Sequence, residues 1–350
     1  MNKANEGFGG FQARPRKTLR LSQEDLVESQ LHDPEDPRQF LLVVKPKVHP
    51  LNLVSWAESA REQVDAWLLR HATILFRGFS VESMDQFHGF ARTLYSELLD
   101  YQERAAPRRE VGKGVYTSTE FPPDQIIPLH HEMSYSHNWP AKILFYCDLP
   151  STTGGCTPIT DDRRVIDLLD PEVKRRFIEK KVMYVRNYGE GVDLPWQEAF
   201  QTDDRAKVEE YCRKSGAQVE WRDGDRLRTR GVRQVLATHP KTGETVWFNH
   251  AHLFHMSNLE PKVREALLAE FEPDELPRNA FYGDGSPIEE DALHHIREVY
   301  EREAVRFPWQ QGDVLLVDNF LASHGREPFT GPRRILVAMA ELYTDPELGS

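Results

Sequence analysis

The stretch LHHEMSY, residues 129–135, places two histidines and a carboxylate side by side, and all three are side-chain types that can bind a metal ion. In an extended chain the side chains alternate between faces, so His130 and Glu132 point one way while His131 points the other. A helical zinc-peptidase pattern, His-Glu-x-x-His, fails because the next histidine is His137. The extended interpretation predicts His130 and Glu132 as two ligands of a 2-His-1-carboxylate site, which suits non-haem Fe(II).

The third ligand is sought where a buried strand ends in polar residues. An apolar run at 314–317 is followed by the polar stretch 318–326, which contains His324. Such strand ends often carry functional residues, although a surface-loop histidine is the plain alternative. The pair Arg333-Arg334 favours function, because an arginine at the head of a core strand needs an anionic partner. We therefore expect His324 as the third ligand and a dicarboxylate as co-substrate.

Composition limits the classes of partner. The chain has 350 residues, 39% of them hydrophobic, which is enough for one large core, and its net charge of -12 disfavours nucleic acid and membrane surfaces as partners. No apolar run approaches the roughly 18 residues of a membrane span. The three cysteines are too few and scattered for a disulfide framework, and we expect reduced thiols. A cytoplasmic protein that acts on small molecules is predicted.

Apolar periodicity predicts a mostly β fold with flanking helices. Residues 1–50 are expected to form an arm, packed on or extending from a single domain at 51–350, with one short helix near 22–27. Helices are predicted at 53–71, 83–99, 162–182 with a break at 170–171, 195–215, 261–271 and 288–304, and strands at 40–44, 72–79, 142–149, 313–317 and 333–343. Residues 217–248 are predicted to alternate strand and turn, with strands at 218–221, 226–230, 232–238 and 245–248 and turns at 223–224 and 241–243. This order favours a distorted β-sandwich or barrel over an alternating parallel sheet.

Five segments together resemble one known family. They are residues 76–79, 130–132, 154–157, 247–249 and 312–334, within a span of roughly 72–343. The chain resembles the TauD/TfdA family of oxygenases, and most nearly its subgroup of syringomycin-pathway aspartyl hydroxylases and clavaminate synthase-like enzymes. The resemblance implies a double-stranded β-helix (jelly roll) core, and Fe(II), 2-oxoglutarate and O2 as cofactor and co-substrates.

The resemblance also assigns the site residues. It implies that His130, Glu132 and His324 ligate iron, and that Thr157 and Arg334 hold the distal carboxylate of 2-oxoglutarate. We expect the inward positions of the last strand to be Arg334, Leu336 and Ala338, with Arg333 outward. A register shifted by one residue would exchange the two arginines. The taurine enzyme has its sulfonate-binding arginine where this chain has Ala338, so taurine is not the expected substrate.

The expected substrate is an amino acid or its derivative, free or bound to an acyl or peptidyl carrier protein. Glu132 replaces the aspartate of the taurine enzyme, as in the amino-acid hydroxylase subgroup, and its presence as a ligand disfavours halogenation because chloride has no vacant position. Tyr135, Asn249 and Arg326 are expected to contact the substrate. Asn319 and Arg326 flank His324 and are candidates to support the ligands.

Two other functions use the same residues. A zinc hydrolase accepts two histidines and a glutamate, but it leaves the Thr157 turn and the arginine pair unexplained. A non-catalytic binding protein on the same fold would be favoured by loss of a ligand, and all three are present. The hydroxylase interpretation explains more of the sequence than either.

Overall fold

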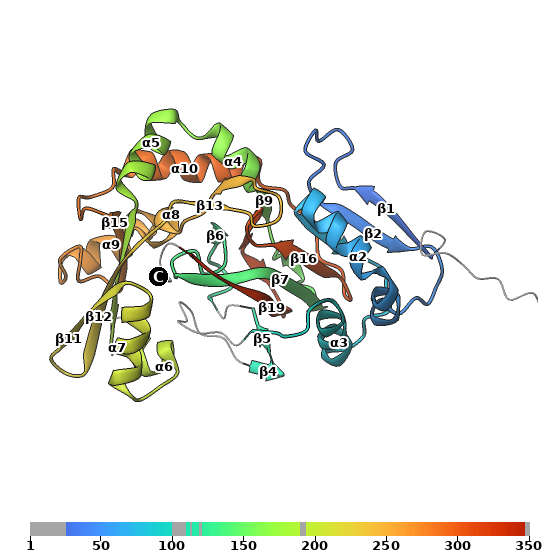
Figure 1. The fold of residues 1–350 in the computed structure, drawn as a ribbon, viewed down its shortest axis with the longest axis horizontal. Helices are drawn as coiled ribbons and strands as arrows, with labels where there is room; N and C mark the ends of the chain where they lie inside the picture. Colours follow the sequence, from blue (N-terminus) through green and yellow to red (C-terminus); the bar gives the residue numbers. More distant parts are fainter. Residues whose placement is uncertain (1–25, 100–109, 113, 119–120, 190–193, 347–350) are drawn as a thin grey trace, which may run out of the picture.

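The computed structural model describes residues 26–346, except 100–109, 113, 119–120 and 190–193, and it is mostly β with helices around the sheets (Figure 1). Its largest sheet has the strand order β1-β2-β3-β16-β7-β19-β5-β4, in which only the β2–β3 pair is parallel. The bounds are β1 Val27–Leu31, β2 Leu42–Pro46, β3 Thr73–Phe76, β16 Val314–Asp318, β7 Asn138–Leu149, β19 Arg334–Thr344, β5 Val115–Thr117 and β4 Glu110–Gly112.

Both faces of this sheet are covered. Helices α2 (Leu53–His71) and α3 (Met84–Leu94) pack on one face and form one apolar core with it, whereas the other face belongs to the main core. The side chains of β19 alternate between the two. Ile335, Val337 and Met339 enter the main core, and Leu336, Ala338 and Ala340 enter the helix-covered core. Because both sets are apolar, hydrophobicity alone does not reveal the phase of this strand.

A second sheet faces the main core. It has the order β6-β17-β9, with bounds Ile127–His130, Ala322–Arg326 and Ile159–Asp161. In β17, His324 pairs with His130 on one side and with Ile159 on the other. The residues of the candidate site lie on or next to this small sheet and the facing strands of the large one.

A third sheet, β11-β12-β10-β15, lies to one side of these two (Figure 1). Its strands are Ala217–Arg222, Arg226–Arg233, Val182–Tyr188 and Arg278–Tyr282. The strands predicted within 217–248 form two antiparallel pairs: β11–β12, whose turn residue Gly224 has a φ of 70°, and the short pair β13 (Leu236–Thr238) and β14 (Thr245–Trp247). The neighbouring helices are α4 Asp162–Leu168, α5 Pro171–Lys180, α6 Trp196–Phe200, α7 Arg205–Lys214, α8 Ala251–Phe254, α9 Pro261–Leu268 and α10 Glu290–Glu303.

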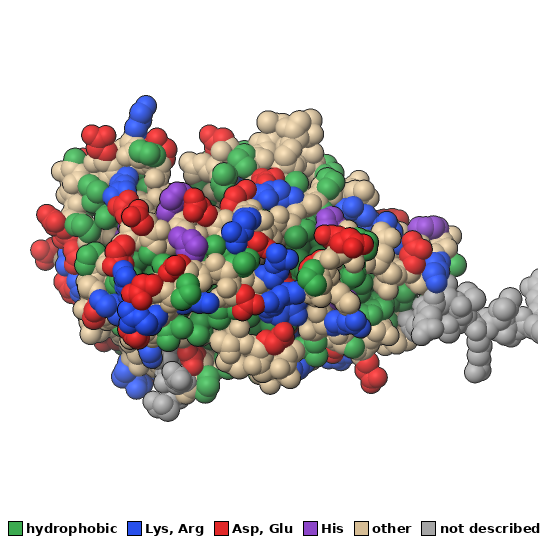
Figure 2. Space-filling view, turned by 90° about the horizontal axis from the view of Figure 1, so that it is seen from above, with side chains coloured by type: hydrophobic (Ala, Val, Ile, Leu, Met, Phe, Trp, Pro, Cys, Tyr) green, Lys and Arg blue, Asp and Glu red, His purple; other side chains and the backbone are tan. Residues whose placement is uncertain are grey.

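Residues 27–46, within the segment expected to be an arm, contribute two strands to the large sheet. Strand β1 and strand β2 occupy positions in the large sheet, the latter where a strand at 40–44 was expected. The helix expected near 22–27 lies almost wholly outside the described residues, and the domain boundary at residue 50 stays a prediction. On the face shown in Figure 2, acidic and basic side chains are interspersed. No helix in the described ranges is long and apolar enough to cross a membrane.

Candidate active site

The structure brings the three predicted metal ligands together. His130 ends β6 and pairs with His324 of β17, and their ring centroids are 4.6 Å apart. The chain then turns at Met133, whose φ is 60°, and Glu132 lies 3.7 Å from His324 between Oε2 and Nε2. One ligand atom from each of the three lies within 4.8 Å of the others, a spacing that fits a single metal ion.

Hydrogen bonds fix two of these ligands for metal binding. Nδ1 of His130 donates to the carbonyl of Pro128 at 2.8 Å, which leaves the Nε2 lone pair for a metal. The side chain of Asn319 holds the backbone of Glu132 from both sides: Oδ1 accepts from its N–H at 2.8 Å, and Nδ2 donates to its carbonyl at 3.0 Å. The donor set therefore fits Fe(II), and Asn319 supports the ligands as expected.

His131 faces away from the metal ligands, as the extended interpretation predicts. It is fully buried, with Nδ1 2.7 Å from the carbonyl of Asn319. Nε2 lies 3.1 Å from the carbonyl of Trp247 and 3.2 Å from Asp162. Burial by itself would lower the pKa of His131, but Asp162 and the two carbonyls outweigh it and raise the pKa. Its role is to join the metal-bearing segment to the surrounding core.

The turn that leads to His324 is held by a buried ion pair. Nζ of Lys142 lies 2.6 Å from Asp318, and Nε2 of His239 lies 3.2 Å from the same oxygen. The other oxygen of Asp318 accepts from the backbone of Phe320 at 3.0 Å. Burial alone would raise the pKa of Asp318, but the charge of Lys142 and the hydrogen bond from His239 outweigh it and lower the pKa to about 2.

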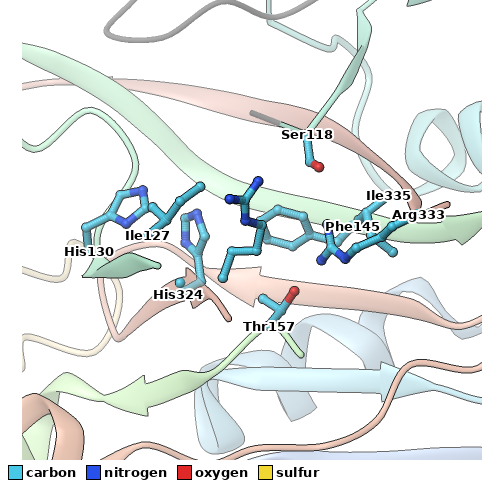
Figure 3. Close-up of a pocket in the computed structure, with 10 residues that line it drawn as sticks. Ser118, Ile127, His130, Phe145, Thr157, His324, Arg333 and Ile335 are labelled. Carbon is cyan, nitrogen blue, oxygen red and sulfur yellow. The ribbon is translucent and has the colours of Figure 1, made fainter. Parts of the chain in front are cut away.

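A cavity opens next to the metal ligands, between the small sheet and the large one (Figure 3). Its empty volume is about 410 Å³, part of which is open to solvent. Both polar and apolar side chains line it. It is lined by Ser118, Ile127, His130, Phe145, Thr157, His324, Gly325, Arg326, Arg333 and Ile335. Thr157, expected to bind 2-oxoglutarate, is among them, and Arg334 is not.

The prediction that Arg334 faces inward is wrong. Its side chain is 65% exposed and pairs with Asp148 on the outside of the sheet. Arg333 instead lines the cavity, where its Nε donates to the carbonyl of Gly155 at 3.1 Å. Burial, and secondly the charge of Arg326, lower the pKa of Arg333 to about 10. Among the described residues no carboxylate pairs with Arg333, so the cavity holds a cation in need of an anion.

The prediction for Arg334 failed because the inward and outward positions of the strand were exchanged. A strand with period two was assumed correctly, but its inward positions are Arg333, Ile335 and Val337 rather than the even-numbered set. The register between β19 and β7 also shifts between Arg334 and Ile335. Since both faces are buried beyond residue 334, the apolar run after the arginine pair gave no signal to choose between them.

Trp309 orients Thr157, and no local sequence pattern predicts this contact. Nε1 of Trp309 donates to Oγ1 of Thr157 at 3.0 Å in a buried contact between residues 152 positions apart. An indole N–H only donates, so Thr157 accepts from it and its own hydroxyl hydrogen is left to donate. The Thr157 side chain lines the cavity, so that hydrogen is available to a carboxylate there.

The three expected substrate residues lie in different places. Tyr135 does not line the cavity; its ring stacks on Phe254 at 5.1 Å and meets the edge of His250 at 5.2 Å. His250 in turn lies 5.2 Å from His130, so Tyr135 is separated from the metal ligands by one ring. Arg326 lines the cavity beside the metal ligands.

Asn249 does not fit the expected substrate role. It is 1% exposed, and its Nδ2 donates to the carbonyl of Val235 at 3.3 Å, while Oδ1 accepts from the N–H of Ala251 at 3.2 Å. Both ends of the amide thus bond to backbone groups, one at the start of α8 and the other at Val235. The residue shapes this turn and does not line the cavity.

His250, His252 and His255 serve separate structural contacts. Nδ1 of His250 lies 2.6 Å from the hydroxyl of Ser134, and Nε2 of His252 lies 2.8 Å from the carbonyl of Leu129. Burial lowers the pKa of all three, to about 3 for His252 and about 4 for His255. Within the described residues, the cluster that fits a metal is the one at His130. The three cysteines are free thiols, as expected.

Comparison with known proteins agrees with this site. The profile of the family described as "Taurine catabolism dioxygenase TauD, TfdA family" matches residues 41–339. The chain is 44% identical over 278 residues to the dapdiamide synthesis protein DdaC of Enterobacter agglomerans, covering 79% of this chain and 84% of DdaC. It is 32% identical over 337 residues to a clavaminate synthase-like protein of Arabidopsis thaliana, covering 91% and 98% of the two chains.

The fold has a counterpart among solved structures. The PvcB protein of Pseudomonas aeruginosa superposes with a TM-score of 0.56 at 15% identity, covering 97% of this chain and 98% of PvcB. At that identity the likeness concerns the fold alone. The family match and the two sequence relatives exclude a zinc hydrolase and a non-catalytic binding protein as the activity of this site. The chain belongs to the TauD/TfdA family and is a non-haem Fe(II)- and 2-oxoglutarate-dependent dioxygenase.

Proposed function

We propose that this dioxygenase hydroxylates an unactivated C–H bond of an amino acid or amino-acid-derived substrate, free or bound to a carrier protein, in secondary metabolism. The observation that carries the proposal is a His130–Glu132–His324 cluster beside a cavity that holds a partly buried cation, Arg333, with no carboxylate partner among the described residues. The 44% identity to a protein of dapdiamide synthesis supports the substrate class. The two facing sheets support a double-stranded β-helix core.

The protein residues divide the work of binding. His130, Glu132 and His324 would hold Fe(II) through two imidazole nitrogens and one carboxylate oxygen. When bound, Fe(II) and 2-oxoglutarate supply the oxidising chemistry, with O2 consumed and succinate and carbon dioxide released. Arg333 and Thr157 receive the distal carboxylate of the co-substrate, the first by charge and the second by its free hydroxyl hydrogen.

Apolar side chains shield the same cavity. The ring of Phe145 lies 5.0 Å from that of His324, and Ile127 and Ile335 form further walls. Apolar side chains exclude water from the cavity. This strengthens the ion pair between the distal carboxylate and Arg333, and it keeps water from competing for the metal. Glu132 would supply a carboxylate ligand where a halogenating enzyme needs room for chloride, so hydroxylation is favoured over halogenation.

Succinate release measures this function. Purified protein with Fe(II) and 2-oxoglutarate would be screened against free amino acids and against the same aminoacyl groups on a carrier protein. We expect substrate-dependent succinate with one of these sets, and a hydroxylated product 16 Da heavier by mass spectrometry, since one oxygen atom is added. His324→Ala is the matched control and should abolish both signals. Coupling to neither set would contradict the proposed substrate class.

A further inference from the structure

Arg326 makes contacts that metal and co-substrate binding do not explain. It ends β17, two residues after His324, and is only 6% exposed. Its Nη1 donates to the carbonyl of Phe121 at 2.9 Å, and its Nη2 donates to the carbonyls of Pro122 at 2.6 Å and Gln125 at 2.9 Å. One guanidinium therefore holds three backbone carbonyls of a single loop.

This loop forms part of the rim of the cavity. Ser118, which precedes it in the sequence, and Ile127, which follows it directly, both line the cavity. Between them, residues 121–126, called here the rim loop, carry two outward apolar side chains. Phe121 is 43% exposed and Ile126 is 62% exposed. The rim loop thus presents apolar surface beside the metal and co-substrate site.

The same guanidinium faces the anion cavity. The guanidinium carbons of Arg326 and Arg333 each lie 5.4 Å from the ring centroid of Phe329, so the two cations share one aromatic neighbour. The N–H of Phe329 also donates to the carbonyl of Pro123 in the rim loop, at 2.9 Å. Nε of Arg326 is buried without a hydrogen-bond partner among the described residues. Burial lowers the pKa of both arginines.

We propose that Arg326 is a positioning residue that couples anion binding in the cavity to the placement of the rim loop. The proposal rests on the proposed function, because the anion is the distal carboxylate of 2-oxoglutarate. A carboxylate beside Arg333 offsets the electrostatic repulsion between the guanidinium groups of Arg326 and Arg333. Its negative charge also attracts Arg326 and so holds that side chain in place. Because linkage is reciprocal, whatever fixes Arg326 for the anion also fixes the rim loop.

Amide hydrogen exchange of the peptide 121–127 tests the coupling in Fe(II)-loaded protein kept anaerobic, with and without 2-oxoglutarate. In the wild type we expect 2-oxoglutarate to slow exchange of this peptide by at least about threefold. Arg326→Gln should lose that slowing and raise the dissociation constant of 2-oxoglutarate about tenfold. Arg326→Lys keeps the charge but not the three-carbonyl fork, so it should lose the slowing while binding 2-oxoglutarate within about threefold of wild type.

Arg306→Gln is the matched control. Arg306 bridges Glu327 and Glu301 outside the cavity, so its loss should leave both measurements unchanged. If wild-type protein binds 2-oxoglutarate but exchange at 121–127 does not change, or if Arg326→Gln retains the change, the coupling is refuted and the proposed function stands. If the wild type binds no 2-oxoglutarate, both are refuted. Should the glutamine variant fail to fold, the lysine variant decides.

Discussion

Replacing Arg333 with glutamine should weaken 2-oxoglutarate binding far more than the same change at Arg334. Arg333 lines the cavity and no carboxylate among the described residues pairs with it, so its charge is free for the co-substrate. A hydrogen bond to a charged group contributes about 1.5–3 kcal/mol. At about 1.4 kcal/mol per tenfold change, the dissociation constant should rise roughly 10- to 150-fold.

The same substitution at the neighbouring residue, Arg334→Gln, is the control. Arg334 is the next residue, its side chain is 65% exposed, and its partner is Asp148 on the outer side of the sheet. Arg334→Gln should therefore change 2-oxoglutarate affinity by less than about twofold, since a surface pair contributes about 0–1 kcal/mol, and that to stability. Affinity is measured anaerobically by calorimetry. Weaker binding in the Arg334 variant with unchanged binding in the Arg333 variant would refute the orientation of this strand.

The stability of the Arg333→Gln variant should change in the opposite direction to its 2-oxoglutarate affinity. Because Arg333 is held in the cavity without a carboxylate partner, Arg333→Gln removes a buried charge, and we expect a melting temperature equal to or above that of the wild type without co-substrate. The stabilisation that 2-oxoglutarate adds to the wild type should then be missing. A large loss of stability without co-substrate would show that Arg333 is structural.

Three further changes test the supports of the site. Asn319→Ala should lower Fe(II) affinity about 10- to 100-fold, as loss of a group that orients metal ligands typically does, and metal titration measures it. Trp309→Phe removes the N–H that orients Thr157 and should weaken 2-oxoglutarate binding by about 0.5–1.5 kcal/mol without changing Fe(II) affinity. Asp318→Asn removes the carboxylate at 2.6 Å from buried Lys142 and leaves it only Glu341, 3.9 Å away, so urea unfolding at pH 7 should show a loss of about 3 kcal/mol. Because the pKa of Asp318 is lowered to about 2 in the folded protein, its contribution should be present above pH about 4 and be lost as the pH falls through about 2; a wild-type stability curve flat over that window would contradict this pairing.

The sequence was informative where one face of a segment carries chemistry and the other carries the core. The alternation of His130, His131 and Glu132 predicted which side chains meet the metal and which one turns away, and the structure has that arrangement. His324 was found because polar residues follow an apolar strand. Both are local patterns, which a single sequence displays directly.

The predictions that failed, or that were not made, concern residues whose positions depend on tertiary packing rather than on a local sequence pattern. Arg333 and Arg334 precede a strand buried on both faces, so neither phase was marked by polar residues. Trp309 meets Thr157 across 152 residues, a contact set by the packing of the whole domain. Asn249 was taken for a substrate residue because it is polar and follows a strand, yet such a residue equally satisfies backbone groups at a helix start.

The assignment as an Fe(II)- and 2-oxoglutarate-binding site is tested most directly by visible absorption of the anaerobic protein. Fe(II) and 2-oxoglutarate together should give a weak charge-transfer band in the wild type, because the co-substrate chelates iron at the positions that His130, Glu132 and His324 leave open. The band should be absent in His324→Ala and present, at a higher 2-oxoglutarate concentration, in Arg333→Gln. No band in the wild type, or an unchanged band in His324→Ala, would contradict the assignment of this centre.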